Sequence, residues 1–152
     1  GIHLADLALW ALDFPKIEKV MSQLFHQGQR ILGSSEKVED FATATLELAT
    51  GTTLRLTCSW RLQAGCDAII GASFYGTSGG AEMRNVNGSF YDFAAERFRG
   101  TSRELLVEPP EEWGGRAAVD WARKLNQGNS FDPACTEYIT TAEAIDRIYR
   151  SA

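Results

Sequence analysis

Hydrophobic and polar positions alternate most regularly between residues 41 and 61. Two runs, Phe41 to Ala49 and Thr52 to Arg61, place an apolar side chain at nearly every second position, which is typical of strands with one buried face. The Thr50-Gly51 pair between them fits a tight turn, so the pattern predicts a β-hairpin. Its predicted inner face consists of Ala42, Ala44, Leu46, Leu48, Leu54, Leu56, Cys58 and Trp60. The outer face can be solvated or can pair with another subunit, and it carries Thr43, Thr45, Thr53, Thr57 and Ser59.

Shorter apolar segments predict further strands after this hairpin. They cover Asp67–Tyr75, Ala81–Val86, Ser89–Phe93 and Glu104–Val107. The first of them leads into a glycine-rich loop, Gly76 to Gly80. Asn87-Gly88, between the second and the third, is a dipeptide typical of hairpin turns. The last is expected at a sheet edge, because Pro109-Pro110 would stop its hydrogen-bond ladder.

Helices are expected at both ends of the chain. They are predicted over Gly1–Trp10, Ala117–Gln127 and Thr136–Arg150. Gly128 fits a helix C-cap after the second. The apolar stripe of the third consists of Tyr138, Ile139, Ala142, Ile145, Ile148 and Tyr149. Pro15 to Gln27 is ambiguous, because its apolar residues follow helical spacing, and Gly28 to Lys37 is predicted to be a loop.

The order of these elements, a helix followed by many strands and then helices, predicts an α+β fold. We expect helices packed on one face of a mostly antiparallel, open-faced sheet. A length of 152 residues predicts one domain, and the sequence contains no internal repeat.

Composition and charge exclude several classes of protein. The net charge of −5, without a cluster of Lys and Arg, argues against a nucleic-acid surface. No stretch of the sequence is long and apolar enough to predict a membrane span. Cys58, Cys66 and Cys135 are odd in number and lack metal-type spacing, so we expect reduced thiols in a cytoplasmic protein. His26 stands far from His3 without a ligand pattern, and no metal site is predicted.

The first predicted helix carries the most distinctive chemistry. His3, Asp6 and Trp10 stand at positions i, i+3 and i+7, so they share one stripe of an otherwise apolar helix. A buried carboxylate or imidazole needs a partner. No capping residue precedes this helix, and we expect the chain to be one domain of a longer protein.

Five motifs in order along the chain carry a resemblance to a known family. They are Gly1-x-His3-x-x-Asp6, Val38-Glu39-Asp40 before the hairpin with Gly51, Ser59-Trp60, Gly76 to Gly80, and Ala144 to Ala152. In this order they resemble the C-terminal domain of the glucose–fructose oxidoreductase and inositol dehydrogenase family, Gfo/Idh/MocA. The resemblance implies a fold like the C-terminal domain of glyceraldehyde-3-phosphate dehydrogenase. It also implies that Lys16 to Gln27 is a strand.

The family resemblance further implies a division of labour over the whole length, residues 1–152. This domain would provide substrate contacts and the oligomer interface, in a homodimer or tetramer formed through the open sheet face. A separate N-terminal Rossmann domain would bind NAD or NADP, and this chain has no G-x-G-x-x-G fingerprint of its own. The implied activity is oxidation of a secondary hydroxyl of a sugar or polyol by hydride transfer.

Site residues come from that resemblance. His3 matches the family's active-site histidine and would bind the substrate hydroxyl or relay its proton. The competing interpretation is a core histidine satisfied by Asp6, whose carboxylate could instead contact a polyol hydroxyl or anchor the helix. Arg61 and Trp60 could face a sugar, whereas Trp10 is expected in core packing.

Two further expectations stay open at this point. Tyr75 and the Gly76–Gly80 turn could line the substrate cleft. The alternative function is a non-catalytic dimerisation or scaffold domain of a degenerate family member, which would keep the fold but lack the catalytic Lys and Asp that the resemblance places upstream of this chain.

Overall fold

The computed structural model describes residues 1–33, 36–110, 112–128 and 132–152. They divide into two compact units. Unit 1 consists of Gly1–Gln63 and Pro133–Ala152, and unit 2 of Ala64–Asp132. Each unit contains one four-stranded sheet.

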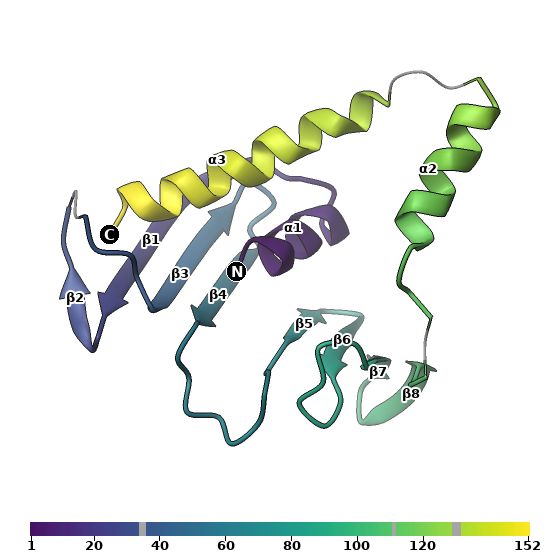
Figure 1. Ribbon diagram of the computed structural model, residues 1–152, viewed down its shortest axis with the longest axis horizontal. Helices are drawn as coiled ribbons and strands as arrows, with labels where there is room; N and C mark the ends of the chain where they lie inside the picture. Colours follow the sequence, from purple (N-terminus) through teal and green to yellow (C-terminus); the bar gives the residue numbers. More distant parts are fainter. Residues whose placement is uncertain (34–35, 111, 129–131) are drawn as a thin grey trace. The chain divides into compact units, whose positions relative to one another are not determined.

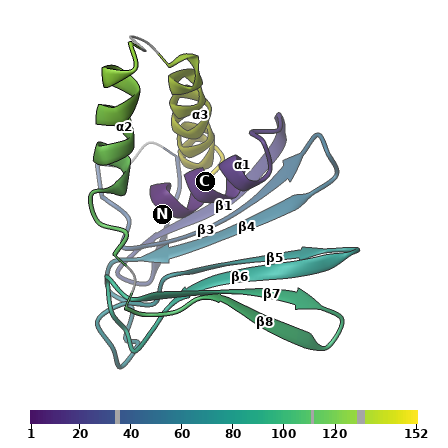
Figure 2. The ribbon, with the colours of Figure 1, turned by 90° about the vertical axis from the view of Figure 1, so that its right-hand side faces the viewer.

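Unit 1 is an antiparallel sheet with two helices on one face (Figures 1 and 2). The strand order is β2-β1-β3-β4, with β1 at Ile17–His26, β2 at Gln29–Ile31, β3 at Phe41–Leu48 and β4 at Thr53–Ser59. The helices are α1 (Ile2–Ala11) and α3 (Glu137–Arg150), the latter preceded by a 3₁₀ turn at Pro133–Thr136. Residues from the two ends of the chain thus share one layer.

The core of unit 1 lies between that layer and the sheet. Leu46 of β3 and Leu9 of α1 are its most completely buried side chains. The alternating inner face predicted for β3 is confirmed, since Ala42, Ala44, Leu46 and Leu48 are all buried. Ala144 and Ile148 of α3 belong to the same cluster. The face of the hairpin that carries the hydroxyl side chains is the one directed away from this core, as predicted.

Polar contacts also fasten α3 to β1. The buried Ser22 hydroxyl donates to the carbonyl of Ile148 at 2.5 Å and lies 2.8 Å from the Ser151 hydroxyl. The Arg147 guanidinium donates to the carbonyls of Ile17 and Glu18 at 2.6 and 3.0 Å. These bonds join segments far apart in the sequence and fix how α3 lies on the sheet.

Unit 2 is a second antiparallel sheet, with strand order β5-β6-β7-β8. Its elements are β5 (Gly71–Gly76), β6 (Gly79–Asn85), β7 (Phe93–Arg99), β8 (Ser102–Val107) and α2 (Arg116–Asn126). Only Ala94 and Glu96 are buried among its described residues, and α2 has no buried residue. Unit 2 therefore has very little core of its own.

The predicted fold class is confirmed: two antiparallel sheets and three α-helices make an α+β fold. The segment Lys16–Gln27 contains strand β1 (Ile17–His26), as the resemblance implied, and β8 lies at a sheet edge, as predicted. No described helix combines the length and the hydropathy needed to cross a membrane.

Several predicted elements were wrong in detail. β2 lies inside the segment expected to be a loop, of which residues 34–35 fall outside the described part. Ser89 to Asp92 is a loop, and the strand that pairs with β6 begins only at Phe93. On α3, Tyr138 and Ile139 are exposed, whereas Thr141 is buried beside Ala144 and Ile148. The polar Thr141 belongs to the inner stripe because it has a hydrogen-bond partner there.

Candidate active site

The first turn of α1 presents His3 to the surface of unit 1. Ala5 and Leu9 are the buried residues of this helix. Successive residues of an α-helix are separated by about 100° around the axis, so His3 and Trp10 lie on the side opposite to that pair. His3 is exposed and makes no hydrogen bond to Asp6 among the described contacts. The interpretation of His3 as a core histidine satisfied by Asp6 is therefore wrong.

Asp6 lies at the border between the buried and exposed sides of α1. Its Oδ1 accepts a hydrogen bond from the Thr141 hydroxyl of α3 at 2.6 Å. The carboxylate is half-buried, and this is its only bond to a described residue. The hydrogen bond to Thr141 is what an anchoring role of Asp6 requires, the third of the three roles named for this residue.

Trp10 is 64% exposed, so the expected core packing of this side chain is wrong. The inner side of α1 is filled by Leu9 and Ala5, which leaves the next residue pointing outward. An exposed indole on the same side as His3 gives the surface of α1 a large apolar component.

The beginning of α1 lies against the end of β4. A Cβ atom added to Gly1 would come within 3.1 Å of the Cys58 Sγ, so a side chain at this position would be crowded. Gly1 serves as N-cap without a side-chain hydrogen bond, and its carbonyl accepts from the Ala5 amide at 3.1 Å. The first turn of α1 is therefore set by packing on β4 and not by a capping side chain.

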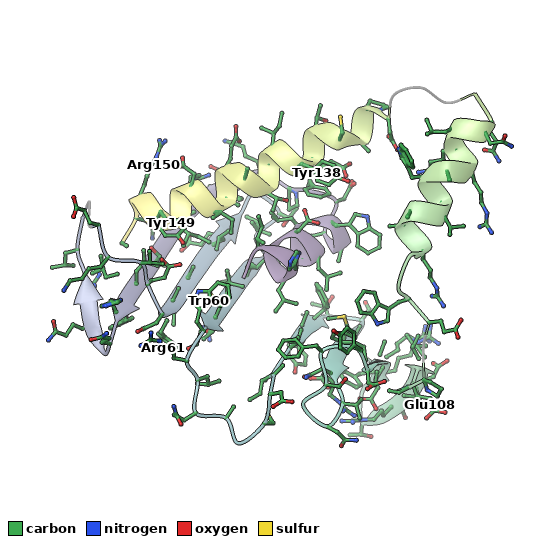
Figure 3. All side chains as sticks on the ribbon, viewed as in Figure 1. Trp60, Arg61, Glu108, Tyr138, Tyr149 and Arg150 are labelled. Atoms are coloured by element: carbon green, nitrogen blue, oxygen red, sulfur yellow. The ribbon has the colours of Figure 1, made fainter. Side chains whose placement is uncertain are left out.

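Trp60 and Arg61 come directly after β4 and are both exposed (Figure 3). The amide of Trp60 donates to the carbonyl of Asp40 at 3.0 Å, and the Ser59 hydroxyl accepts from the amide of Arg61 at 3.2 Å. The predicted inward position of Trp60 is wrong, because the strand ends at Ser59 and the indole is 83% exposed. Arg61 and His3 thus come from the two chain segments that meet near Cys58.

Tyr149 and Glu39 form a pair at the end of α3 that the sequence did not suggest. The Tyr149 hydroxyl donates to Glu39 Oε1 at 2.5 Å. This hydrogen bond, with smaller contributions from partial burial and from the negative charge of Glu39, raises the pKa of Tyr149 to about 12. The two residues are too far apart in the chain for any local pattern to show the contact.

In unit 2, the glycine-rich segment forms the turn between β5 and β6. Gly76 pairs with Gly79 across Thr77-Ser78. A Cβ on Gly79 would come within 2.8 Å of the Phe98 carbonyl, so close approach of the strands explains this glycine. The turn borders a hollow of about 650 Å³ that Tyr75, Phe98 and Arg103 also line. A role of this segment in substrate binding stays a prediction.

Cofactor and metal chemistry have little support from the described residues themselves. No group of three or more His, Cys, Asp or Glu side chains among them could hold a metal ion. Both sheets are antiparallel, whereas dinucleotide phosphates typically lie at a helix N-terminus after a parallel strand. The three cysteines are free thiols.

Comparison with known proteins identifies the family. The model of the GFO/IDH/MocA C-terminal domain matches residues 1–82, more than half of the chain. No curated protein matches.

Solved structures share the fold at low sequence identity. An aldose-aldose oxidoreductase from Caulobacter crescentus, complexed with glycerol, is 16% identical with a TM-score of 0.71, and the match covers 100% of this chain and 43% of that one. A 3-ketoreductase from Actinomadura kijaniata, in complex with TDP-benzene and NADP in an open conformation, is 18% identical with a TM-score of 0.73 over 99% and 45%. UDP-N-acetylglucosamine 3-dehydrogenase from Acidithiobacillus ferrooxidans is 15% identical with a TM-score of 0.58 over 99% and 45%.

The chain therefore spans less than half the length of these proteins, and likeness at such identities shows the fold alone. The family itself rests on the sequence match. By that match, this chain belongs to the GFO/IDH/MocA C-terminal domain family.

Proposed function

We propose that this chain is the C-terminal domain of an NAD(P)-dependent oxidoreductase that oxidises a secondary hydroxyl of a sugar or polyol. The main observation in support of this proposal is the family match over the segment that contains His3, Asp6 and Arg61. Two solved neighbours with this fold are named as oxidoreductases, a 3-ketoreductase in complex with NADP and UDP-N-acetylglucosamine 3-dehydrogenase, and they agree with the general kind of activity proposed. Residues 1–152 would form the substrate and oligomer domain, and a Rossmann domain would precede it.

NAD or NADP would be held mainly by that preceding domain. The sequence lacks the glycine fingerprint, and the described strands form no parallel β-α-β unit that could cradle the pyrophosphate. When bound, the nicotinamide supplies the hydride acceptor. The residues of this chain are left with binding the substrate and moving its hydroxyl proton.

His3 is proposed as the catalytic residue. Oxidation of a secondary alcohol transfers the hydrogen on carbon as a hydride and leaves the hydroxyl proton to be accepted by a base. A neutral imidazole nitrogen can accept a proton, and the imidazole of His3 is exposed on the surface of α1. It would accept the proton and pass it on to water.

Asp6 and Arg61 are proposed to bind substrate. A half-buried carboxylate with one oxygen already held by Thr141 can accept a hydrogen bond from a polyol hydroxyl at the other. Arg61 would contribute donors from the end of β4, which α1 contacts through Gly1. Carbohydrates are commonly bound by such planar polar groups because adjacent hydroxyls can be contacted in pairs.

The proposed function also includes an oligomer and a compartment. The exposed face of the unit 1 sheet offers Thr43, Thr45 and Met21 to a second copy, giving a homodimer or tetramer. Light scattering that finds only a monomer of the full-length protein would contradict this part. Free cysteines support a reducing, cytoplasmic compartment.

The direct test replaces His3 by alanine in the full-length protein. We expect kcat to fall by roughly 10²- to 10⁴-fold, the usual contribution of a positioned acid or base. The matched control is His26→Ala, because that histidine lies on β1 with its Nδ1 2.8 Å from the Val38 carbonyl and has no proposed role. Steady-state rates would be measured with D-glucose, myo-inositol and UDP-N-acetylglucosamine, each with NAD⁺ and NADP⁺.

The pH dependence decides between catalysis and mere structural support. If His3→Ala retains a rate within a few-fold of wild type from about pH 6 to 9, the proposed role is wrong. If the wild-type protein oxidises none of the tested hydroxyls with either cofactor, the proposed activity fails for these substrates.

A further inference from the structure

We propose that Thr141 is a positioning residue that acts on the substrate through Asp6. This inference rests on the proposed function, because it gives Asp6 a substrate contact. It adds a residue from the opposite end of the chain, outside the matched segment 1–82.

Thr141 is the polar member of an otherwise apolar stripe. The buried residues of α3 are Thr141, Ala144 and Ile148, spaced at i, i+3 and i+7 toward the core of unit 1. A valine would fill nearly the same volume there without a hydroxyl to satisfy. The polar residue of this stripe is the one that donates to Asp6.

The geometry of the bond fits a fixed carboxylate. Thr141 is 4% exposed, and its Oγ1 lies 2.6 Å from Asp6 Oδ1. A threonine inside a helix can point its hydroxyl to solvent or return it to a carbonyl of its own preceding turn. Here the proton crosses to another helix and to a charged acceptor, and such charge-assisted bonds are shorter and stronger than neutral ones.

The consequence is an oriented acceptor beside His3. Holding Oδ1 limits rotation of the Asp6 side chain, while Oδ2 makes no bond to a described residue. Asp6 is half-buried and stands one helical turn from His3. A polyol hydroxyl would therefore meet a carboxylate oxygen that is already in place, which lowers the entropy lost on binding.

The same hydrogen bond could also serve only to hold α1 against α3, which is a purely structural role, here called a tie. The two interpretations differ in the effect expected from loss of the bond. A tie affects stability alone, whereas a positioning residue changes substrate binding through Asp6 and has no effect once Asp6 can no longer bind substrate.

The test uses four variants of the full-length protein: Thr141→Val, Thr141→Ser, Asp6→Asn and the double variant Thr141→Val with Asp6→Asn. Thr140→Val is the matched control, because Thr140 is the adjacent residue and its hydroxyl bonds to no described residue. The probe is whichever of D-glucose, myo-inositol and UDP-N-acetylglucosamine the wild-type protein oxidises fastest with NAD⁺ or NADP⁺.

Thr141→Val should lower kcat/KM roughly tenfold, mainly through KM, as expected for loss of a hydrogen bond to a charged group that binds substrate. Thr141→Ser should stay within about twofold of wild type, because it keeps the donor, and so should Thr140→Val. In the Asp6→Asn background, adding Thr141→Val should change kcat/KM by less than about twofold. A full tenfold loss in that background, or no loss in Thr141→Val alone, would overturn the inference.

A second measurement separates this inference from the proposed function. Side-chain couplings of Asp6 by NMR should show one χ1 rotamer in wild type and Thr141→Ser, and averaging in Thr141→Val. If the wild-type protein shows no turnover but the averaging occurs, only the proposed activity is lost and the positioning of Asp6 stands. If Asp6 keeps one rotamer in Thr141→Val, the positioning role is wrong, whatever the activity.

Discussion

Units 1 and 2 are both four-stranded antiparallel sheets, yet only unit 1 closes an apolar core. Every member of the buried hydrophobic cluster belongs to unit 1. Two helices, α1 and α3, cover one face of that sheet, whereas α2 of unit 2 buries none of its residues. A sheet becomes a stable scaffold when a layer of apolar side chains covers one of its faces.

Unit 2 depends on backbone ladders and charged pairs instead. Arg103 contacts Glu96 at 3.0 Å, and Arg97 contacts Glu104 at 2.6 Å. Exposed ion pairs contribute little to stability, because water screens them. The scaffold of the candidate active site is therefore unit 1, which is held together by its packed core and by the hydrogen bonds between α3 and β1.

The largest expected effect comes from opening the core of unit 1. Leu46→Ala should lower the free energy of unfolding by about 2–5 kcal/mol, since Leu46 is 1% exposed and the substitution leaves a cavity. The matched substitution in unit 2 is Leu105→Ala, which should cost less than about 1 kcal/mol because that side chain is 51% exposed.

Both values would come from urea unfolding monitored by circular dichroism. Amide hydrogen exchange would assign the loss to a unit, with β3 losing protection in Leu46→Ala. Equal losses of unfolding free energy in the two variants would show that packing in unit 2 stabilises the fold as much as the core of unit 1 does. That result would contradict the difference described between the two units.

A smaller effect is expected where unit 2 does bury a charge. Glu96 is 7% exposed, and Glu96→Gln should cost about 1–2 kcal/mol, because charge-assisted bonds from the Arg103 guanidinium are weakened. Glu104→Gln is the control in the same sheet. Its pair with Arg97 is shorter but exposed, so the loss should stay below about 0.5 kcal/mol.

Urea unfolding of the two variants shows whether burial or the distance between the charged groups controls how much an ion pair of unit 2 contributes to the free energy of unfolding. A larger loss for Glu104→Gln would mean that the shorter distance matters more than burial in unit 2, contrary to expectation.

The local pattern of apolar and polar residues was enough to predict the β3–β4 hairpin but not to predict β1. The alternation in β3 is regular because its inner face is entirely apolar. On β1, the buried positions include Ser22, a polar residue whose partner Ile148 lies at the other end of the chain. Periodicity therefore suggested a helix, and family resemblance corrected it. β7 was missed for the same reason, since Glu96 is buried among its apolar neighbours.

In the candidate site, too, local sequence pattern identified some residues and missed others. His3 and Asp6 stand three residues apart, so the spacing on one helix and the family motif both pointed to them. Thr141 and Tyr149 come from α3, and only the fold brings them to Asp6 and Glu39. The exposure of Trp10 and Trp60 was not predictable from hydrophobicity, because a large aromatic residue fits equally well in a core or on a binding surface.

The smallest expected effect concerns the Tyr149–Glu39 pair, a polar contact in the well-packed unit 1. Its hydrogen bond raises the pKa of Tyr149 from about 10 in the unfolded chain to about 12 in the folded one. The neutral form is the one stabilised, so the contribution is complete below about pH 10 and is lost as the pH rises toward 12. Because Tyr149 is 49% exposed, solvent screening reduces its value to roughly 0.5 kcal/mol.

Tyr149→Phe should therefore be less stable than wild type by that small amount at pH 8, and the difference should shrink between about pH 10 and 12. Tyr138→Phe is the control, because Tyr138 lies on the same helix, is 71% exposed and bonds to no described residue through its hydroxyl. Urea unfolding at a series of pH values checks both variants against wild type. A Tyr149→Phe difference that grows with pH would mean that the hydroxyl stabilises unit 1 through a contact other than Glu39.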